Sequence, residues 1–283
     1  MARNGWCALA VMLATAALHA SRAAAQTQQQ IDWCNNNGNA FSVDQRIGGC
    51  TALVESGRAS VQNRAAGYSN RCWAYSDKGD PDQAITDCND AIRLNPKLAN
   101  AYLNRGKAYS DKLDFDRAIA DYNQAIQLDP KFFQTYLARG LLSLDAGELP
   151  KALADINQAS ALSPKDPYTA LWLDIVNKRS KLPSRLAEAT AQIDTTKWPA
   201  PVIRLYLGQM TPQAVLAAAA DLDASKQKSQ VCEANFFSGE LALQQGRKDE
   251  ATRLLRIAAE GCPKDSFQLT AANAELKALG AQP

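Results

Sequence analysis

The chain has 283 residues, of which 46% are hydrophobic and 21% charged, enough for one continuous repeat-built domain. Its 31 basic and 29 acidic residues give a formal net charge of +2, and no basic block offers a footprint for nucleic acid. The one histidine, His19, lies in a segment that we expect to be removed, so the remainder has no Ser-His or Cys-His pair. Carboxylate or lysine chemistry stays compatible with this composition, but no spacing indicates it. We predict a protein that is not an enzyme and has no cofactor or metal.

Residues 1–25 have the three parts of a secretory signal peptide. Arg3 gives a basic start, an apolar run covers residues 6–18, and three alanines at 23–25 form a small-residue exit. The run is too short to span a bilayer, and Arg22 follows it. We therefore predict cleavage after Ala25 and export to the periplasm, with no transmembrane helix in the mature chain.

The cysteines after residue 25 are even in number, as in a disulfide-bonded exported protein. Two pairs have the same spacing, and the members of the third pair are further apart. The repeated spacing predicts that residues 26–64 form a divergent helical hairpin, stapled like the hairpin that follows it. We expect three intra-hairpin disulfides; the alternative is a metal site or a redox pair, without a CxxC motif. The pairs are Cys34 with Cys50, Cys72 with Cys88, and Cys232 with Cys262.

From Ala65 to Pro164 the chain repeats itself with a fixed period, which is the step from Tyr68 to Tyr102 and from Tyr102 to Tyr136. A period of this length predicts an all-α solenoid of helix pairs, which presents a long surface. Small residues let two antiparallel helices approach, and each copy closes on a proline that stops its second helix. The other residues in register are Ala84, Ala118 and Ala152; Ala91, Ala125 and Ala159; and Pro96, Pro130 and Pro164.

This pattern resembles the tetratricopeptide repeat (TPR): aromatic residues at places four and eleven, Gly at eight, Ala at twenty and twenty-seven, and Pro at thirty-two. The second copy fits best, with Gly106, Tyr109 and Tyr122 beside the residues above. A fourth, isolated match contains Gly239, Gly246, Ala251, Leu255, Ala258 and Pro263. Gly79 and Gly246 stand where the turn between paired helices needs a left-handed residue.

An arginine stands at the seventh place of each repeat, where a leucine normally packs. An aspartate follows each one at the same offset that separates the first two cysteine pairs. We favour a repeated, half-buried ion pair that fixes helix register, because an unpaired buried charge is costly. A ladder of arginines for carboxylates or phosphates is the alternative. The expected pairs are Arg71 with Asp87, Arg105 with Asp121, and Arg139 with Asp155.

The resemblance implies that the first helices of the repeats line a concave, partner-binding face. Asparagine and lysine there partly match the pattern that clamps a C-terminal carboxylate, but a row of aspartates would repel one. We therefore expect a mixed groove for an extended peptide or a partner helix, with Trp73 as an aromatic anchor. Two alternatives stay open: Trp73 packs against the upstream hairpin, and the aspartates form a solvated helix end. The expected groove residues are Asn70, Trp73, Asp77, Asn104, Lys107 and Asp111.

Residues 165–230 keep a helical period but lose the residue pattern of the repeats, so we expect an irregular helical connector there. Residues 231–283 should form the isolated TPR-like hairpin and a capping helix, which covers the exposed end of a solenoid. The expected helices are 167–178, 183–193, 202–207 and 213–220 in the connector, and 266–279 at the end.

This order of three repeats, connector, isolated repeat and closing helix resembles the NlpI-type TPR scaffold proteins of the Gram-negative envelope. The resemblance implies an adaptor that brings together a peptidoglycan hydrolase and an envelope protease. A chaperone-like peptide-binding module for secretion or outer-membrane assembly is the alternative. We expect a protein or peptide partner, and a homodimer is compatible with an exposed solenoid end or groove.

Overall fold

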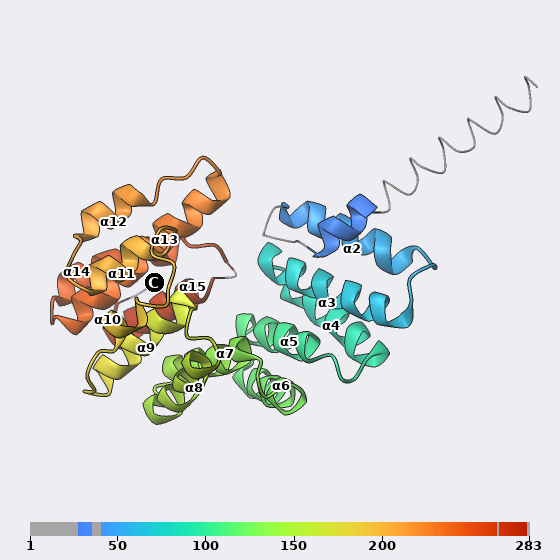
Figure 1. The fold of residues 1–283 in the computed structure, drawn as a ribbon, viewed down its shortest axis with the longest axis horizontal. Helices are drawn as coiled ribbons and strands as arrows, with labels where there is room; N and C mark the ends of the chain where they lie inside the picture. The colour runs from blue at the N-terminus through green and yellow to red at the C-terminus, as the bar shows by residue number, and fades with distance from the viewer. Residues whose placement is uncertain (1–27, 36–40, 265, 282–283) are drawn as a thin grey trace, which may run out of the picture. The chain divides into compact units, whose positions relative to one another are not determined.

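The computed structural model describes residues 28–35, 41–264 and 266–281; the predicted signal peptide lies outside them. All of the regular structure in this part of the chain is helical, which confirms the prediction of an all-α solenoid (Figure 1). The helices form two compact units, residues 1–108 and 109–283. None of the described helices is both long and apolar enough to cross a membrane.

The first unit is a short series of helical hairpins. Ser60 caps α3 by accepting a hydrogen bond from the backbone N–H of Asn63, and Asp80 caps α4 ahead of a proline in its first turn. Gly79 joins these two helices with a left-handed φ of 78°. The unit comprises a helix over 28–35, α2 (Val43–Glu55), α3 (Val61–Lys78), α4 (Pro81–Leu94) and most of α5 (Ala99–Asp111).

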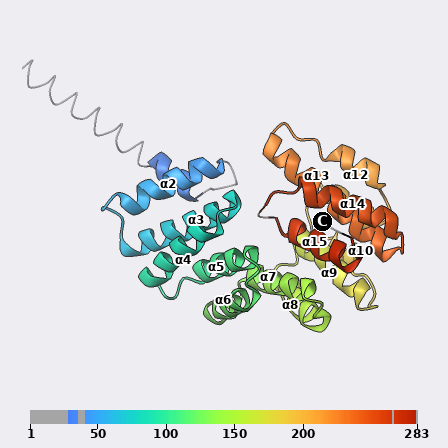
Figure 2. The same ribbon diagram turned by 180° about the vertical axis from the view of Figure 1, so that it is seen from behind.

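The second unit continues the hairpins and closes on a larger core. Trp172, Phe236 and Phe237 meet in this core with ring centroids 5.2–5.8 Å apart, and Tyr206 packs edge-on against Phe237. Figure 2 shows the C-terminal helices α13, α14 and α15 lying together, and they contribute Phe236, Leu255 and Leu276 to this core. The helices are α6 (Phe115–Leu128), α7 (Phe133–Asp145), α8 (Leu149–Leu162), α9 (Pro167–Arg179), α10 (Leu186–Ala189), α11 (Ala200–Tyr206), α12 (Pro212–Ala218), α13 (Ala224–Gln244), α14 (Lys248–Gly261) and α15 (Phe267–Ala278).

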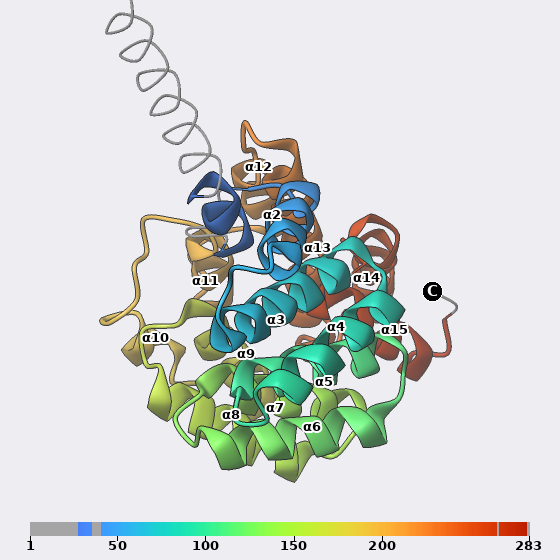
Figure 3. The same ribbon diagram turned by 90° about the vertical axis from the view of Figure 1, so that its right-hand side faces the viewer.

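The backbone period runs further than the residue pattern does. Helices α5, α7 and α9 begin at Ala99, Phe133 and Pro167, and each is 13 residues long. Figure 3 shows α7, α8 and α9 following one another side by side. Helix α9 therefore occupies the place of the first helix of a fourth repeat, although it has lost the residues by which a repeat is recognised.

The connector differs from expectation at its second helix. The expected helix over 183–193 is reduced to α10. Its N-cap residue, Arg185, makes no side-chain hydrogen bond to the first turn, and the helix gives way to turns after Ala189. Helices α11 and α12 lie close to the predicted bounds, and so does α15. Ile203 of α11 and Val215 of α12 are buried and pack these two short helices against the rest of the unit.

Paired helices approach each other closely at places eight and twenty-four of the third repeat and at the same places of the isolated hairpin. A Cβ built on Gly140 would lie 2.8 Å from Cγ1 of Ile156, and one on Gly239 would lie 2.9 Å from Cγ of Leu255. In the first repeat a disulfide takes this position, with the Cα atoms of the two cysteines 5.5 Å apart. The structure pairs the cysteines as Cys34–Cys50, Cys72–Cys88 and Cys232–Cys262.

Candidate partner-binding surface

Trp73 of α3 is half-covered by the helix before it. The guanidinium of Arg46 (α2) lies 4.4 Å from the centroid of the indole ring, and 36% of Trp73 remains exposed. Nη1 of Arg46 also donates to Oδ2 of Asp77 at 2.5 Å, and both side chains are largely buried. The tryptophan thus packs on the upstream hairpin through one contact and still presents an apolar surface to solvent.

The amides expected in the groove have different surroundings. Nδ2 of Asn104 (α5) donates to the backbone carbonyl of Ser69 at 3.0 Å, so this side chain ties α5 to α3. The ammonium nitrogen of Lys107 is buried. The side chain of Asn70 is half-buried and makes no hydrogen bond to another described residue. Asn70 and Trp73 stand one turn apart on the same face of α3, and they form the part of the predicted groove that a partner can reach in the first unit.

The predicted row of aspartates is not uniform. Asp77 is engaged by Arg46, whereas Asp111, at the end of α5, is exposed. Burial raises the pKa of Asp145 (α7) to about 7, with a further contribution from the nearby carboxylate of Glu275.

The first helix of the third repeat is covered by the C-terminal helix. Leu141 and Leu144 of α7 are buried in the same core as Leu276 of α15, and α15 contacts α7 directly. This surface of the second unit is therefore filled by the chain itself. A partner-binding role is better supported at α3, where Trp73 is exposed.

One arginine forms ion pairs with two carboxylates beside this covered surface. Arg179, the last residue of α9, lies 2.6 Å from a carboxylate oxygen of Glu240 (α13) and 2.6 Å from one of Glu275 (α15). Burial raises the pKa of Glu240 to about 7, even though Arg179 opposes this shift. The sequence analysis missed this cluster, whose members lie on three helices far apart in the sequence.

Two of the three expected arginine–aspartate pairs lie within single units. Arg71 donates to both carboxylate oxygens of Asp87, at 2.7 and 2.8 Å, and Arg139 binds both oxygens of Asp155, at 2.7 and 2.6 Å. Burial raises the pKa of Asp87 although Arg71 lowers it. These arginines are engaged inside the repeats, which favours the structural interpretation over a ligand ladder.

The third expected pair divides between the units, and it stays a prediction. Arg105 belongs to the first unit and Asp121 to the second. Within its own unit, Nη1 of Arg105 donates to Oδ1 of Asn89 at 2.7 Å, an acceptor that the sequence analysis did not consider. Among the described residues, no cluster of His, Cys, Asp or Glu side chains has an arrangement suited to a metal ion.

Comparison with known families identifies the repeat. Residues 65–98 and 99–132 match the family model of the tetratricopeptide repeat. No curated protein matches the chain significantly. These matches leave the likeness to NlpI-type proteins untested, and it stays a prediction.

Solved structures of repeat proteins resemble the chain. One is yeast Tom70, with a TM-score of 0.51 and 17% identity over 84% of this chain and 60% of that chain. Another is a tetratricopeptide repeat protein from Parabacteroides merdae, with a TM-score of 0.48 and 16% identity over 86% of this chain and 96% of that chain. A third is YrrB, described as a TPR protein with an unusual peptide-binding site, with a TM-score of 0.40 and 17% identity over 78% of this chain and 96% of that chain. At this identity, the likeness to Tom70 shows the fold alone.

Proposed function

We propose that this chain, in which residues 65–98 and 99–132 match the tetratricopeptide repeat, is a scaffold that acts by binding a protein partner rather than by catalysis. The observation that carries the proposal is the exposed indole of Trp73 beside the half-buried amide of Asn70 on α3, which has no recorded hydrogen bond to another described residue. Aromatic side chains contribute strongly at interface centres, and an amide can bond the backbone of an extended peptide. The occupant of this surface is a peptide segment or a helix of the partner.

We place this scaffold in the periplasm. The proposal rests on the signal-peptide pattern of residues 1–25 and on the three cysteine pairs, since disulfides persist in oxidising compartments. By the likeness to NlpI-type proteins, the partner is an envelope protease or a peptidoglycan hydrolase. The division at residues 26–64, 65–164, 165–230 and 231–283 stays part of the same proposal.

The test is a crosslinked pull-down of the full chain from its own envelope fraction. The variant Asn70→Ala/Trp73→Ala removes the proposed surface, and the matched control Val61→Ala removes an exposed apolar side chain elsewhere on α3. We expect the wild type and the control to capture one or two defined proteins, and the double variant to lose them. Thermal unfolding of all three proteins checks that they are folded.

Other results would contradict parts of the proposal. A diffuse set of weakly held clients would replace the adaptor with the chaperone-like function. Capture of the same protein by the double variant would remove the site from α3. Recovery of this chain alone, at the mass of a dimer, would replace the partner with a second copy.

A further inference from the structure

A tyrosine and an arginine on the first helix of one repeat bond residues of the repeat before it, and we call this contact the junction between the two repeats. At the first junction, Nη1 of Arg105 donates to Asn89 at 2.7 Å, and the hydroxyl of Tyr102 donates to the carbonyl of Pro96 at 3.2 Å. The guanidinium of Arg105 lies 5.6 Å from the centroid of the Tyr102 ring. The same contacts recur one repeat later, where Arg139 donates to Asn123 at 2.5 Å and Tyr136 to Pro130 at 3.3 Å.

The junction between α8 and α9 keeps the asparagine and proline acceptors of this arrangement without its donors, and the place of Asp155 is here Ala189. Asn157 and Pro164 stand one repeat after Asn123 and Pro130, but the tyrosine place is now Ala170 and the arginine place is Leu173. The amide nitrogen of Asn157 bonds a carbonyl of its own helix at 2.9 Å, which leaves its oxygen without a donor among the described residues. The first helix of a fourth repeat is present as α9, and the two side chains that would fill its junction with α8 are missing.

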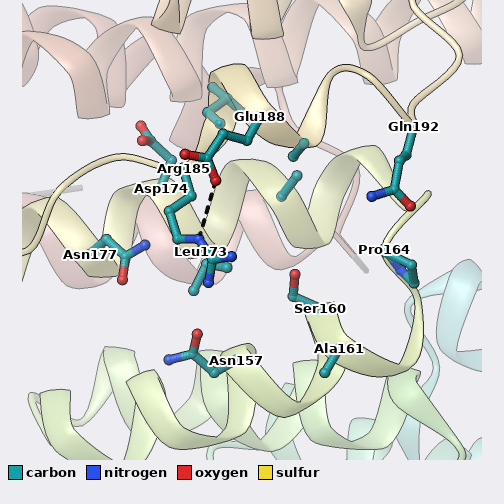
Figure 4. A pocket seen from close by; sticks show the side chains of 13 residues that line it. Asn157, Ser160, Ala161, Pro164, Leu173, Asp174, Asn177, Arg185, Glu188 and Gln192 are labelled. Atoms are coloured by element: carbon teal, nitrogen blue, oxygen red, sulfur yellow. Dashed lines mark ion pairs between the residues drawn. The ribbon is translucent and has the colours of Figure 1, made fainter.

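A pocket of about 450 Å³ occupies this place (Figure 4). Ala170 and Leu173 form part of its apolar wall. Two further polar residues of α9 line it. Asn177 is 5% exposed and its side chain has no recorded hydrogen bond to a described residue, whereas both carboxylate oxygens of Asp174 are fully buried behind the pocket wall. The one cation recorded beside the Asp174 carboxylate in the described part of the chain is Lys178, whose Nζ lies 2.7 Å away.

We propose that this pocket binds the arginine side chain of a protein partner, in the place that an internal arginine fills at the two preceding junctions. The guanidinium is planar and donates through five N–H groups, so it can serve the oxygens of Asn157 and Asn177 while its charge faces the exposed carboxylate of Glu188, which lines the pocket. Its aliphatic stem covers the wall formed by Leu173. The inference rests on the proposed function in one respect, that the arginine belongs to a bound protein.

The effect of removing Arg185 distinguishes a guanidinium ligand from an anion. The side chain of Arg185 also lines the pocket and ends near Leu173 in Figure 4; it is 69% exposed, with its Nε 3.6 Å from a carboxylate oxygen of Glu188. If the pocket takes a guanidinium, Arg185 competes for the same acceptors, and its removal should not weaken binding. If the pocket takes a carboxylate, Arg185 would be the main source of attraction.

The experiment is a titration of the full chain with N-acetyl-arginine methylamide, followed by NMR of the side-chain amides. We expect saturable shifts of the Asn157 and Asn177 amides, and shifts at least about tenfold weaker with the neutral citrulline analogue, because a charged hydrogen bond is lost. Equal binding of both compounds, or no shift with arginine, would overturn the proposal.

Variants make the test specific to the pocket. Asn157→Ala should weaken binding of the arginine compound by at least about fivefold, and the matched control Gln158→Ala, exposed on the same helix, should not. Arg185→Ala should bind at least as well as the wild type, and loss of binding in this variant would contradict a guanidinium ligand. Capture of a partner without any arginine-dependent shift would overturn this inference alone, and a shift without capture would overturn the proposed function alone.

Discussion

The disulfide between Cys72 and Cys88 should stabilise the first unit chiefly by restricting its unfolded chain. The bond closes a loop with a sequence separation of 16, for which the chain-entropy relation gives about 3 kcal/mol at 25 °C. The third repeat offers a replacement of known shape, because Gly140 and Ile156 fill the same two places. The variant Cys72→Gly/Cys88→Ile keeps the close helix contact and removes the crosslink.

The assay is hydrogen exchange of peptides from α3 and α4, read by mass spectrometry in increasing denaturant. We expect the variant to lose about 3 kcal/mol of opening free energy in these helices under oxidising conditions. With reductant the difference should largely vanish, since both proteins then have an open loop. Peptides from the second unit serve as the internal control. Equal protection in the oxidised wild type and the variant would refute the crosslink argument.

Three further changes test the packing and the charges. Arg71→Leu should cost about 3 kcal/mol of unfolding free energy, because it leaves Asp87 buried without its cation; chemical denaturation should show most of that loss recovered in Arg71→Leu/Asp87→Leu. Because the folded state raises the pKa of Asp145 to about 7, the unfolded state releases this proton first as the pH rises, and stability should fall between about pH 4 and pH 7. Thermal melts of Asp145→Asn should show a flatter slope in this window and, above it, a gain on the order of 1 kcal/mol. Gly140→Ala should lose about 1–3 kcal/mol by overpacking, whereas Gly261→Ala, with no atom within 4 Å of the new methyl, should melt at or above the wild-type temperature.

The sequence predicted the repeats well because their bounds depend on local signals. The turn at Gly79 and the stop at Pro96 act within a few residues of themselves, and the period of the repeat shows the proline three times and the glycine again at Gly147. Helix α9 was predicted as a helix, but its place in the repeat series was not, for the opposite reason. Its cap, Asp166, and its first-turn proline preserve the helix, while the packing residues that carry the family pattern have changed.

The partner-binding surface was only partly predictable, because its contacts are distant in the sequence. Trp73 could be selected by its place in the repeat, but the stacking of Arg46 depends on a hairpin without the repeat pattern. The burial of Leu141 depends on α15, which lies far downstream at the end of the described chain. No periodicity reports such a contact, so a face expected to be open in every repeat is closed in the third.

The return of α15 onto α7 also bears on how this protein could have changed by duplication. A repeat array usually lengthens by copying a helix pair, since each pair contacts only its neighbours. A copy inserted between α8 and α9 would carry Arg179 one repeat away from Asp145 and would separate α15 from Leu144. The segment from α7 to α15 is therefore expected to be inherited as one block, and relatives with more or fewer repeats should differ before α7.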